Sequence, residues 1–440
     1  MSYGKEGSYP IERASKLGHM KVIEHENVRR LLRQFEMVSP DSIEVPLGSC
    51  DGNVDLDAGS PIKYIITIDG GQAVIPNEIR RDKRIAFISV CAMLIRLEDI
   101  ASLRNDPIID PRDLTKMFED RIWYQPAALP LAGIRIPGES VKDTVRHTID
   151  AVLEYSKLYD DLHFLVYRKW NPAYDMNPAS NPDAPHMNCL MCEERVYLPK
   201  YAYSFQCPNC GFHHRLSDYL GIAQQMPDNW SREEAASSLR NAMETLTLFH
   251  FVFRYWNEPK ILSQILFLKD GPLLLRAQLS RLIEPIRDLV ETIKAAGTKL
   301  NLVGVEKNGE LVDHIEDIKK HLQKPGDYFL PSIKYMFEEV AGITFDPTRY
   351  RNRVQYGSKI VVRLGPDHVI PLDITTGNFC LNPTIADLIG FQDIAAVLSK
   401  MVSYSHENAL IPVKLANSFS SISQQPSGDI LQAFTDKLIS

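Results

Sequence analysis

The chain has 440 residues, of which 44% are hydrophobic and 24% charged, and its formal net charge at pH 7 is −7. This composition is typical of a soluble globular protein, and the length predicts roughly two to three domains with a substantial core. No apolar run approaches the roughly 18 residues of a membrane span, so we expect no membrane partner. The first residues lack the apolar segment of a signal peptide, which favours a cytoplasmic location. Because the net charge is negative, a nucleic acid would have to be held by local basic patches.

The N-terminal part of the chain leads to the first candidate site residue. Residues 26–37 predict a short amphipathic helix in an N-terminal arm, and residues 40–60 predict a loop. The apolar run 64–68 is then expected to be a buried strand, and it ends at Asp69, which two glycines follow. Glycine lets another group come close to the backbone. Asp-Gly is also a common turn dipeptide, so a simple turn is the alternative.

A basic run and a long apolar run follow this strand. Arg80, Arg81, Lys83 and Arg84 lie close together. Such a run is either a solvated face or, beside a metal site, a surface that holds a phosphate backbone. Residues 85–95 predict a buried strand or a buried helix, and periodicity does not decide between the two.

Residues 104–230 are predicted to be an insertion. Their first part, 104–182, has many prolines between short apolar runs, with a helix expected at 140–159 and a strand at 163–167. The residues between the two cysteine motifs that follow are expected to form a linking hairpin. His213 and His214 are expected on the surface, with a role as substitute metal ligands as the alternative.

The insertion carries two CxxC motifs. Cys189 and Cys192 are followed, after fourteen residues, by Cys207 and Cys210. Each CxxC turn can direct two sulfurs at one ion, and the pattern is typical of a tetrahedral zinc ribbon, here within residues 186–215. Because four thiolates leave no open position for water, the predicted zinc is structural. Coincidental or redox-active cysteines are the alternative.

Ser231 begins a predicted helix in which Glu244 is the candidate site residue. Glu234 completes the pattern of a capping box. The second half of the helix is apolar on two sides, which predicts burial between layers. A buried carboxylate needs a partner, and a metal ion would serve. An exposed glutamate is the alternative.

The run 265–268 repeats the pattern of the first strand. It is apolar and leads through Lys269 to Asp270, after which Gly271 and Pro272 predict a turn. Brought together, Asp69 and Asp270 would form a hard-oxygen site suited to magnesium or manganese. A long helix is expected at 274–296.

Two later segments carry further candidates. A strand at 300–305 ends in Glu306 and Lys307. These two residues could join the metal site and contact a phosphate, and a plain hairpin turn explains them equally well. Residues 348–363 interleave basic residues with tyrosines, a pattern that fits a nucleic-acid track in which cations meet phosphates and rings stack on bases. A solvated sheet face is the alternative.

Taken in order, several segments resemble the NurA nuclease family. They are IDGG at Asp69, Met243-Glu244 in a helix, FLKDGPL around Asp270, LVGVEKNG ending at Gly309, YGSK ending at Lys359, and NALIPVKLANSFSSI near the C-terminus. KDGPL after a strand is the strongest motif, and the others are informative through their order. The resemblance covers roughly residues 63–84 and 231–440.

This resemblance implies a ribonuclease-H-like α/β fold, in which helices flank a mixed sheet. It also implies manganese-dependent cleavage of DNA, with single-strand endonuclease and 5′-to-3′ exonuclease activity. A homodimer working with a hexameric HerA-type ATPase is implied as well.

Three acidic residues match the family's motifs. Asp69 matches the aspartate of its DGS motif, with Gly71 in place of the serine. Asp270 matches the second metal-binding aspartate, and Glu244 the helical glutamate. Asn417 stands where a histidine is expected, so it could donate a hydrogen bond to a phosphate but could not shuttle a proton in the usual way.

We therefore predict a metal-dependent DNA nuclease that acts in DNA end processing, repair or anti-phage defence. Asp69, Glu244 and Asp270 would hold manganese or magnesium, and Lys307 would complete the catalytic set. The predicted parts are an arm and loop at 1–60, a nuclease core at 61–103 and 231–440, and the insertion at 104–230. The alternatives are a catalytically weak adaptor that binds DNA or a partner through the zinc ribbon, and a hydrolase of small phosphate compounds. The predicted DNA-binding residues are Arg80, Arg81, Lys83, Arg351, Tyr356, Lys359 and Asn417.

Overall fold

The computed structural model describes residues 25–35, 50–75, 83–103, 119–224, 226–227, 233–348, 354–402, 410–422 and 428–438. The chain divides into two compact units, Met1–Leu47 and Gly48–Ser440. In the first unit, the predicted N-terminal helix is present as α2 (Glu26–Leu32). Among all these residues, no helix combines the length and the apolar character that crossing a membrane requires.

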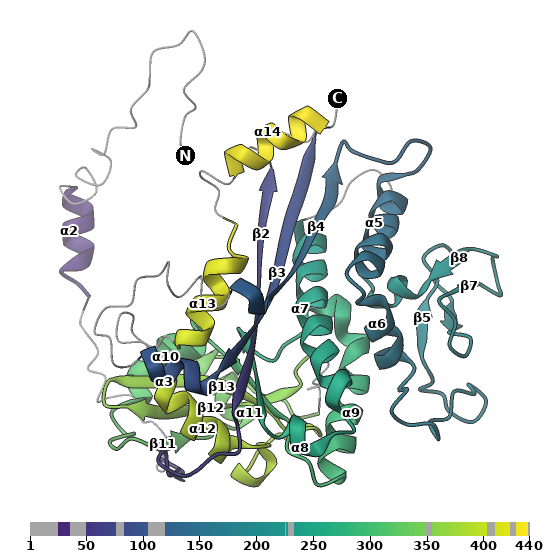
Figure 1. Cartoon of the computed structure of the whole chain (residues 1–440). Helices are drawn as coiled ribbons and strands as arrows, with labels where there is room; N and C mark the ends of the chain where they lie inside the picture. Colours follow the sequence, from purple (N-terminus) through teal and green to yellow (C-terminus); the bar gives the residue numbers. More distant parts are fainter. Residues whose placement is uncertain are drawn as a thin grey trace. The chain divides into compact units, whose positions relative to one another are not determined.

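Within the described part of the second unit, a nine-stranded mixed sheet organises the fold (Figure 1). In spatial order its strands are β1 (Gly52–Asn53), β11 (Asp327–Phe329), β12 (Gly357–Gly365), β13 (His368–Thr375), β10 (Asn301–Val305), β9 (Ile265–Asp270), β2 (Tyr64–Ile75), β3 (Arg84–Arg96) and β4 (Ile122–Ala132). β9 is parallel to both β10 and β2, and the other neighbours are antiparallel. The apolar sequence of β9 reflects this position, since parallel strands are covered on both faces.

Helices cover both faces of the sheet (Figure 1). One face carries α5 (Val141–Tyr155), α6 (Tyr159–Val166), α7 (Glu233–Tyr255) and α9 (Ile283–Ala295), and the other carries α3 (Leu97–Leu103), α12 (Phe391–Leu398) and α13 (Ile411–Ser420). Because side chains alternate along a strand, Ile66 and Ile68 of β2 pack with α7, whereas Ile65 packs with α12 and α13. The predicted class, a mixed α/β sheet flanked by helices, is therefore confirmed. The remaining helices are α8 (Pro259–Leu262), α10 (Glu310–Ile318), α11 (Ile333–Tyr335) and α14 (Asp429–Leu438).

The residues predicted as an insertion contribute to both the sheet and a separate zinc-ribbon-like part. β4 pairs with β3 along most of its length, and α5 packs against β4, so these elements belong to the central fold. The cysteine motifs lie in two small hairpins made by β5 (His186–Asn188) with β6 (Arg195–Tyr197) and by β7 (Ser204–Gln206) with β8 (His213–Arg215). The prediction of one linking hairpin is wrong, because each motif is the turn of its own hairpin.

Two local predictions are also wrong. The strand predicted at 163–167 is the second half of α6, because Leu158, Leu162 and Leu165 are buried at helical spacing. The single helix predicted at 274–296 is a 3₁₀ segment, Ala277–Leu282, followed by α9. The open choice at 85–95 is settled as a strand, β3, which pairs on both sides with β2 and β4.

The turn after Asp270 lies directly against β10. A Cβ on Gly304 would come to 2.5 Å from the carbonyl oxygen of Gly271 and 2.9 Å from the nitrogen of Leu273. Gly304→Ala is therefore expected to lower the free energy of unfolding by about 1–3 kcal/mol, measured by urea denaturation, because backbone atoms have to move. Gly59→Ala is the control, since nothing lies within 4 Å of its Cβ position. Equal stability of the two variants would contradict the close approach.

Candidate active site

Asp69 and Asp270 lie side by side on neighbouring parallel strands. β2 and β9 pair in register up to Ile68 and Lys269, and the two aspartates are the next residues of the two strands. Alternation along each strand puts both carboxylates on the face of the sheet that α12 and α13 cover. β9 ends at Asp270, whereas β2 continues to Ile75. The pair therefore lies at the carboxyl end of a parallel strand, the place where α/β sheets bind ligands.

Glu244 reaches the same part of β2 from the opposite face. It is buried on α7, and a Cβ on Gly70 would collide with its carboxylate oxygen, so glycine at this position is what admits Glu244. Lys269 Nζ lies 3.5 Å from Glu244 Oε2. Arg240 Nε lies 3.5 Å from Glu244 Oε1, and a guanidinium N–H of Arg240 donates to the Gly70 carbonyl at 3.3 Å. Two cations thus hold the buried carboxylate beside Asp69.

The pKa of Asp69 is raised chiefly by burial and further by the neighbouring negative charges. Burial raises it to about 6, with further upward contributions from the charges of Asp270 and Glu244. Hydrogen bonds act in the opposite direction: the Ser420 hydroxyl and the Gly70 N–H each donate to Asp69 at 2.7 Å. Asp69 is consequently ionised at neutral pH and protonated in mild acid.

The charged residues that follow β10 have two different partners. Lys307 Nζ lies 2.7 Å from Asp270 Oδ2. Glu306 pairs instead with Lys359, whose Nζ also lies 3.3 Å from Asp373 Oδ1. Asp373 in turn accepts the N–H of Leu273 at 3.0 Å, which anchors the turn after Asp270. Lys307 is therefore part of the aspartate cluster, and Glu306 belongs to a neighbouring ion-paired cluster.

The predicted DNA-binding residues do not form one exposed track. Tyr356 is 2% exposed, so the prediction that its ring stacks on bases is wrong. The prediction that Lys359 contacts a phosphate is also wrong, because Asp373 and Glu306 hold its charged amine between them. Burial lowers the pKa of Lys359, but these two carboxylates outweigh that effect and raise the pKa. Lys83 and Asn417 are exposed. The predicted residues Arg80, Arg81 and Arg351 lie outside the described residues.

The carboxylates suit a hard divalent cation by chemistry, since magnesium and manganese prefer carboxylate oxygen. Within the described ranges, however, only the four cysteines bring three or more ligand atoms within 4.8 Å of one another. Asp270 and Glu244 are paired with Lys307 and Lys269. In this arrangement the two ammonium groups supply the positive charge that a divalent ion would bring.

The four predicted zinc ligands converge on one point. The sulfurs of Cys189 and Cys210 are 3.6 Å apart, and those of Cys192 and Cys207 are 3.7 Å apart. A tetrahedral zinc ion with sulfur at about 2.3 Å requires sulfur–sulfur distances of about 3.8 Å. The cluster is therefore consistent with a structural zinc site.

A buried polar network joins this cysteine cluster to α5. His214 is fully buried, so the prediction that it lies on the surface is wrong, whereas His213 is exposed as predicted. His214 Nε2 lies 3.3 Å from Cys189 Sγ, and its Nδ1 lies 3.6 Å from Asp218 Oδ2. Arg146 of α5 donates to both Asp218 oxygens, at 2.9 and 2.8 Å, and holds the pKa of that carboxyl at about 2 although burial would raise it.

Several residues that contact the candidate carboxylates were not predicted from the sequence. Lys269 was noticed only as part of the KDGPL motif. No sequence pattern around Ser420 or Arg240 indicates a role in the site. Gly71, in place of the expected serine, was the one indication that another group lies nearby. Cys91, which pairs with Asp69 across β2 and β3, is a neutral neighbour because burial and the charge of Asp69 raise its pKa to about 12.

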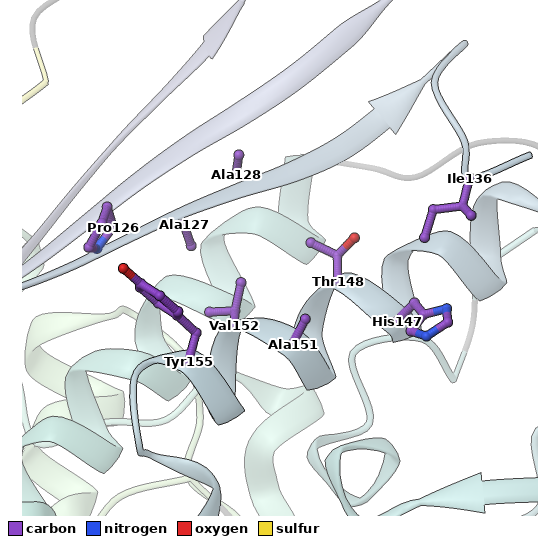
Figure 2. A pocket seen from close by; sticks show the side chains of 9 residues that line it. All are labelled: Pro126, Ala127, Ala128, Ile136, His147, Thr148, Ala151, Val152 and Tyr155. Atoms are coloured by element: carbon purple, nitrogen blue, oxygen red, sulfur yellow. The ribbon is translucent and has the colours of Figure 1, made fainter. Parts of the chain in front are cut away.

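A separate cavity of about 360 Å³ lies between β4 and α5 (Figure 2). Its lining is mostly small and apolar, and the side chain of Tyr155, at the end of α5, extends toward Pro126 of β4 (Figure 2). None of the predicted site residues lines it. The full lining is Pro126, Ala127, Ala128, Ile136, His147, Thr148, Ala151, Val152 and Tyr155.

Comparison with known proteins gives matches among solved structures. No family model and no curated protein matches the chain. The crystal structure of the NurA nuclease from Sulfolobus solfataricus matches with a TM-score of 0.40 and 12% identity, over 96% of this chain and 97% of that one. A second NurA crystal structure matches with a TM-score of 0.34 and 13% identity, over 96% and 98% of the two chains. The chain is thus similar to NurA structures over nearly its full length.

Asp69→Asn should change the pH dependence of stability in the metal-free protein. The pKa of Asp69 is about 6 in the folded chain against an ordinary 3.8, so the folded state binds the extra proton between these values. Stability therefore falls as the pH rises from about 4 to about 6, by roughly 3 kcal/mol for a difference of this size. We expect the difference in the free energy of unfolding, wild type minus Asp69→Asn, to fall by up to roughly 3 kcal/mol between about pH 4 and about pH 6. The measurement is urea denaturation in the presence of EDTA. The exposed Asp57→Asn is the control, and a constant difference between wild type and Asp69→Asn would contradict the raised pKa of Asp69.

Proposed function

We propose that the protein is a metal-dependent deoxyribonuclease that hydrolyses phosphodiester bonds with manganese or magnesium. The observation that carries this proposal is the adjacency of Asp69 and Asp270 at the end of a parallel strand, with Glu244 against Gly70 on the other face. Buried carboxylates are costly unless they have partners. Two adjacent carboxylates with a third close to the same strand provide the oxygen donors that a hard divalent cation prefers.

Each residue has a defined task in this proposal. A divalent ion held by Asp69, Glu244 and Asp270 would supply Lewis-acid stabilisation of the phosphate and a water of lowered pKa. Asp69 would bind as the carboxylate, the form that predominates above about pH 6 in the metal-free protein. Lys307, which pairs with Asp270 in the metal-free protein, would offset negative charge that develops on the phosphate.

The finer features of the proposal depend on the sequence resemblance. These are single-strand endonuclease and 5′-to-3′ exonuclease activity, a homodimer, and a hexameric HerA-type ATPase as partner in DNA end processing, repair or anti-phage defence. Exposed Lys83 and Asn417 remain candidates for contact with DNA. A DNA- or partner-binding adaptor is the second candidate, because lysines already neutralise Asp270 and Glu244.

Asp69→Asn and Asp270→Asn should each abolish cleavage of labelled DNA in manganese, because each removes a negatively charged ligand without changing side-chain volume much. Fragments are measured on gels in manganese, magnesium or EDTA. Asp288→Asn is the matched control, since that carboxylate of α9 pairs with Arg168. Cleavage by Asp69→Asn at the wild-type rate would overturn the proposal. A gel shift without fragments from the wild type would favour the adaptor.

We also propose that Cys189, Cys192, Cys207 and Cys210 hold one structural zinc ion. The wild type should contain one zinc per chain by metal analysis, and Cys192→Ser should lose it and melt at a lower temperature, because zinc binding contributes folding free energy. Cys380→Ser is the control, as that thiol lies outside the cluster. Full zinc content in Cys192→Ser would contradict four-thiolate binding.

A further inference from the structure

The last residue of α13 touches the candidate carboxylate directly. Ser420 is 1% exposed, and its Oγ donates to Asp69 Oδ2 at 2.7 Å. The other oxygen, Oδ1, accepts the Gly70 N–H at 2.7 Å. Both oxygens of Asp69 therefore have a fixed donor, and each keeps a lone pair for a cation. The direction of the carboxylate is set before any cation binds.

Gly71 is what allows this contact. A Cβ on Gly71 would collide with the Ser420 carbonyl and would lie 3.2 Å from the nitrogen of Ile422. Both are backbone atoms, so a side chain at position 71 has to push the end of α13 away from Asp69. Gly71 and Ser420 thus act together, although they lie far apart in the sequence.

The place of α13 does not depend on the Ser420 hydroxyl. Val413 and Leu415 pack into the hydrophobic cluster on this face of the sheet, together with residues of α12 and β2. The hydroxyl adds one charge-assisted hydrogen bond to an already docked helix. Its removal should consequently affect Asp69 more than it affects the fold.

We propose that Ser420 is a positioning residue that orients the Asp69 carboxylate for a divalent cation, and that position 71 must be glycine so that Ser420 can reach it. This inference rests on the proposed metal-dependent function. It adds to that function a contact from the C-terminal helix α13, which ties the candidate site to the end of the chain.

Ser420→Ala tests the proposal. Residues that orient a metal ligand typically contribute 10–100-fold to metal affinity. We therefore expect manganese binding, measured by calorimetry on the full chain, to weaken by roughly 10–100-fold. The manganese concentration for half-maximal cleavage should rise in parallel, while the KM for DNA stays unchanged. Ser418→Ala is the matched control, because its hydroxyl donates within α13, to the Leu415 carbonyl at 2.7 Å.

A second variant tests the shared contact. Gly71→Ala should weaken manganese binding by a similar factor. Adding Ser420→Ala to it should cause little further loss, because both substitutions remove the same contact between Ser420 and Asp69. Losses that multiply in the double variant would overturn the link between the two residues. Should Ser420→Ala fail to fold, as judged by circular dichroism, Gly71→Ala alone decides by its manganese affinity.

The outcomes separate this inference from the proposed function. Wild-type manganese affinity in folded Ser420→Ala, with Asp69→Asn inactive, would overturn the role of Ser420 and leave the nuclease assignment standing. Absence of manganese binding in the wild-type protein would instead overturn the function on which the inference rests.

Discussion

The parallel pairing of β2 with β9 is the constraint on which the site depends. Five residue pairs hold the two strands in register, from Tyr64 with Ile265 to Ile68 with Lys269. A shift by one residue would turn every side chain of one strand to the other face. Burial on both faces forbids such a shift, and this is why two aspartates far apart in sequence arrive side by side.

Charge balance is the second requirement of this arrangement. Asp270 is paired with Lys307 and Glu244 with Lys269 and Arg240, while Asp69 relies on hydrogen bonds. Removing one partner of a buried pair is costly, because the remaining charge stays buried. The ammonium groups of these lysines supply the positive charge that lets the fold tolerate a cluster of acids.

The zinc-ribbon-like part is joined to the core rather than hanging from a flexible linker. His214 contacts the sulfur of Cys189 and lies near Asp218, which Arg146 of α5 binds through two hydrogen bonds. α5 packs on β4, an edge strand of the central sheet. A chain of buried polar contacts thereby connects the cysteine cluster to the central sheet.

The sequence by itself determined the features that depend on local pattern. An apolar run before Asp-Gly predicted the strands of Asp69 and Asp270, and the CxxC spacing predicted the convergence of four sulfurs, since both patterns are set by neighbouring residues. Only the tertiary structure decided which polar residues are buried and with whom. Tyr356 and Lys359 carry the same pattern as an exposed DNA track, and Ser420 lies 351 residues from the carboxylate it contacts. Strand pairing and helix docking bring such partners together. The segments involved lie far apart in the sequence, so no local pattern in one segment indicates its partner.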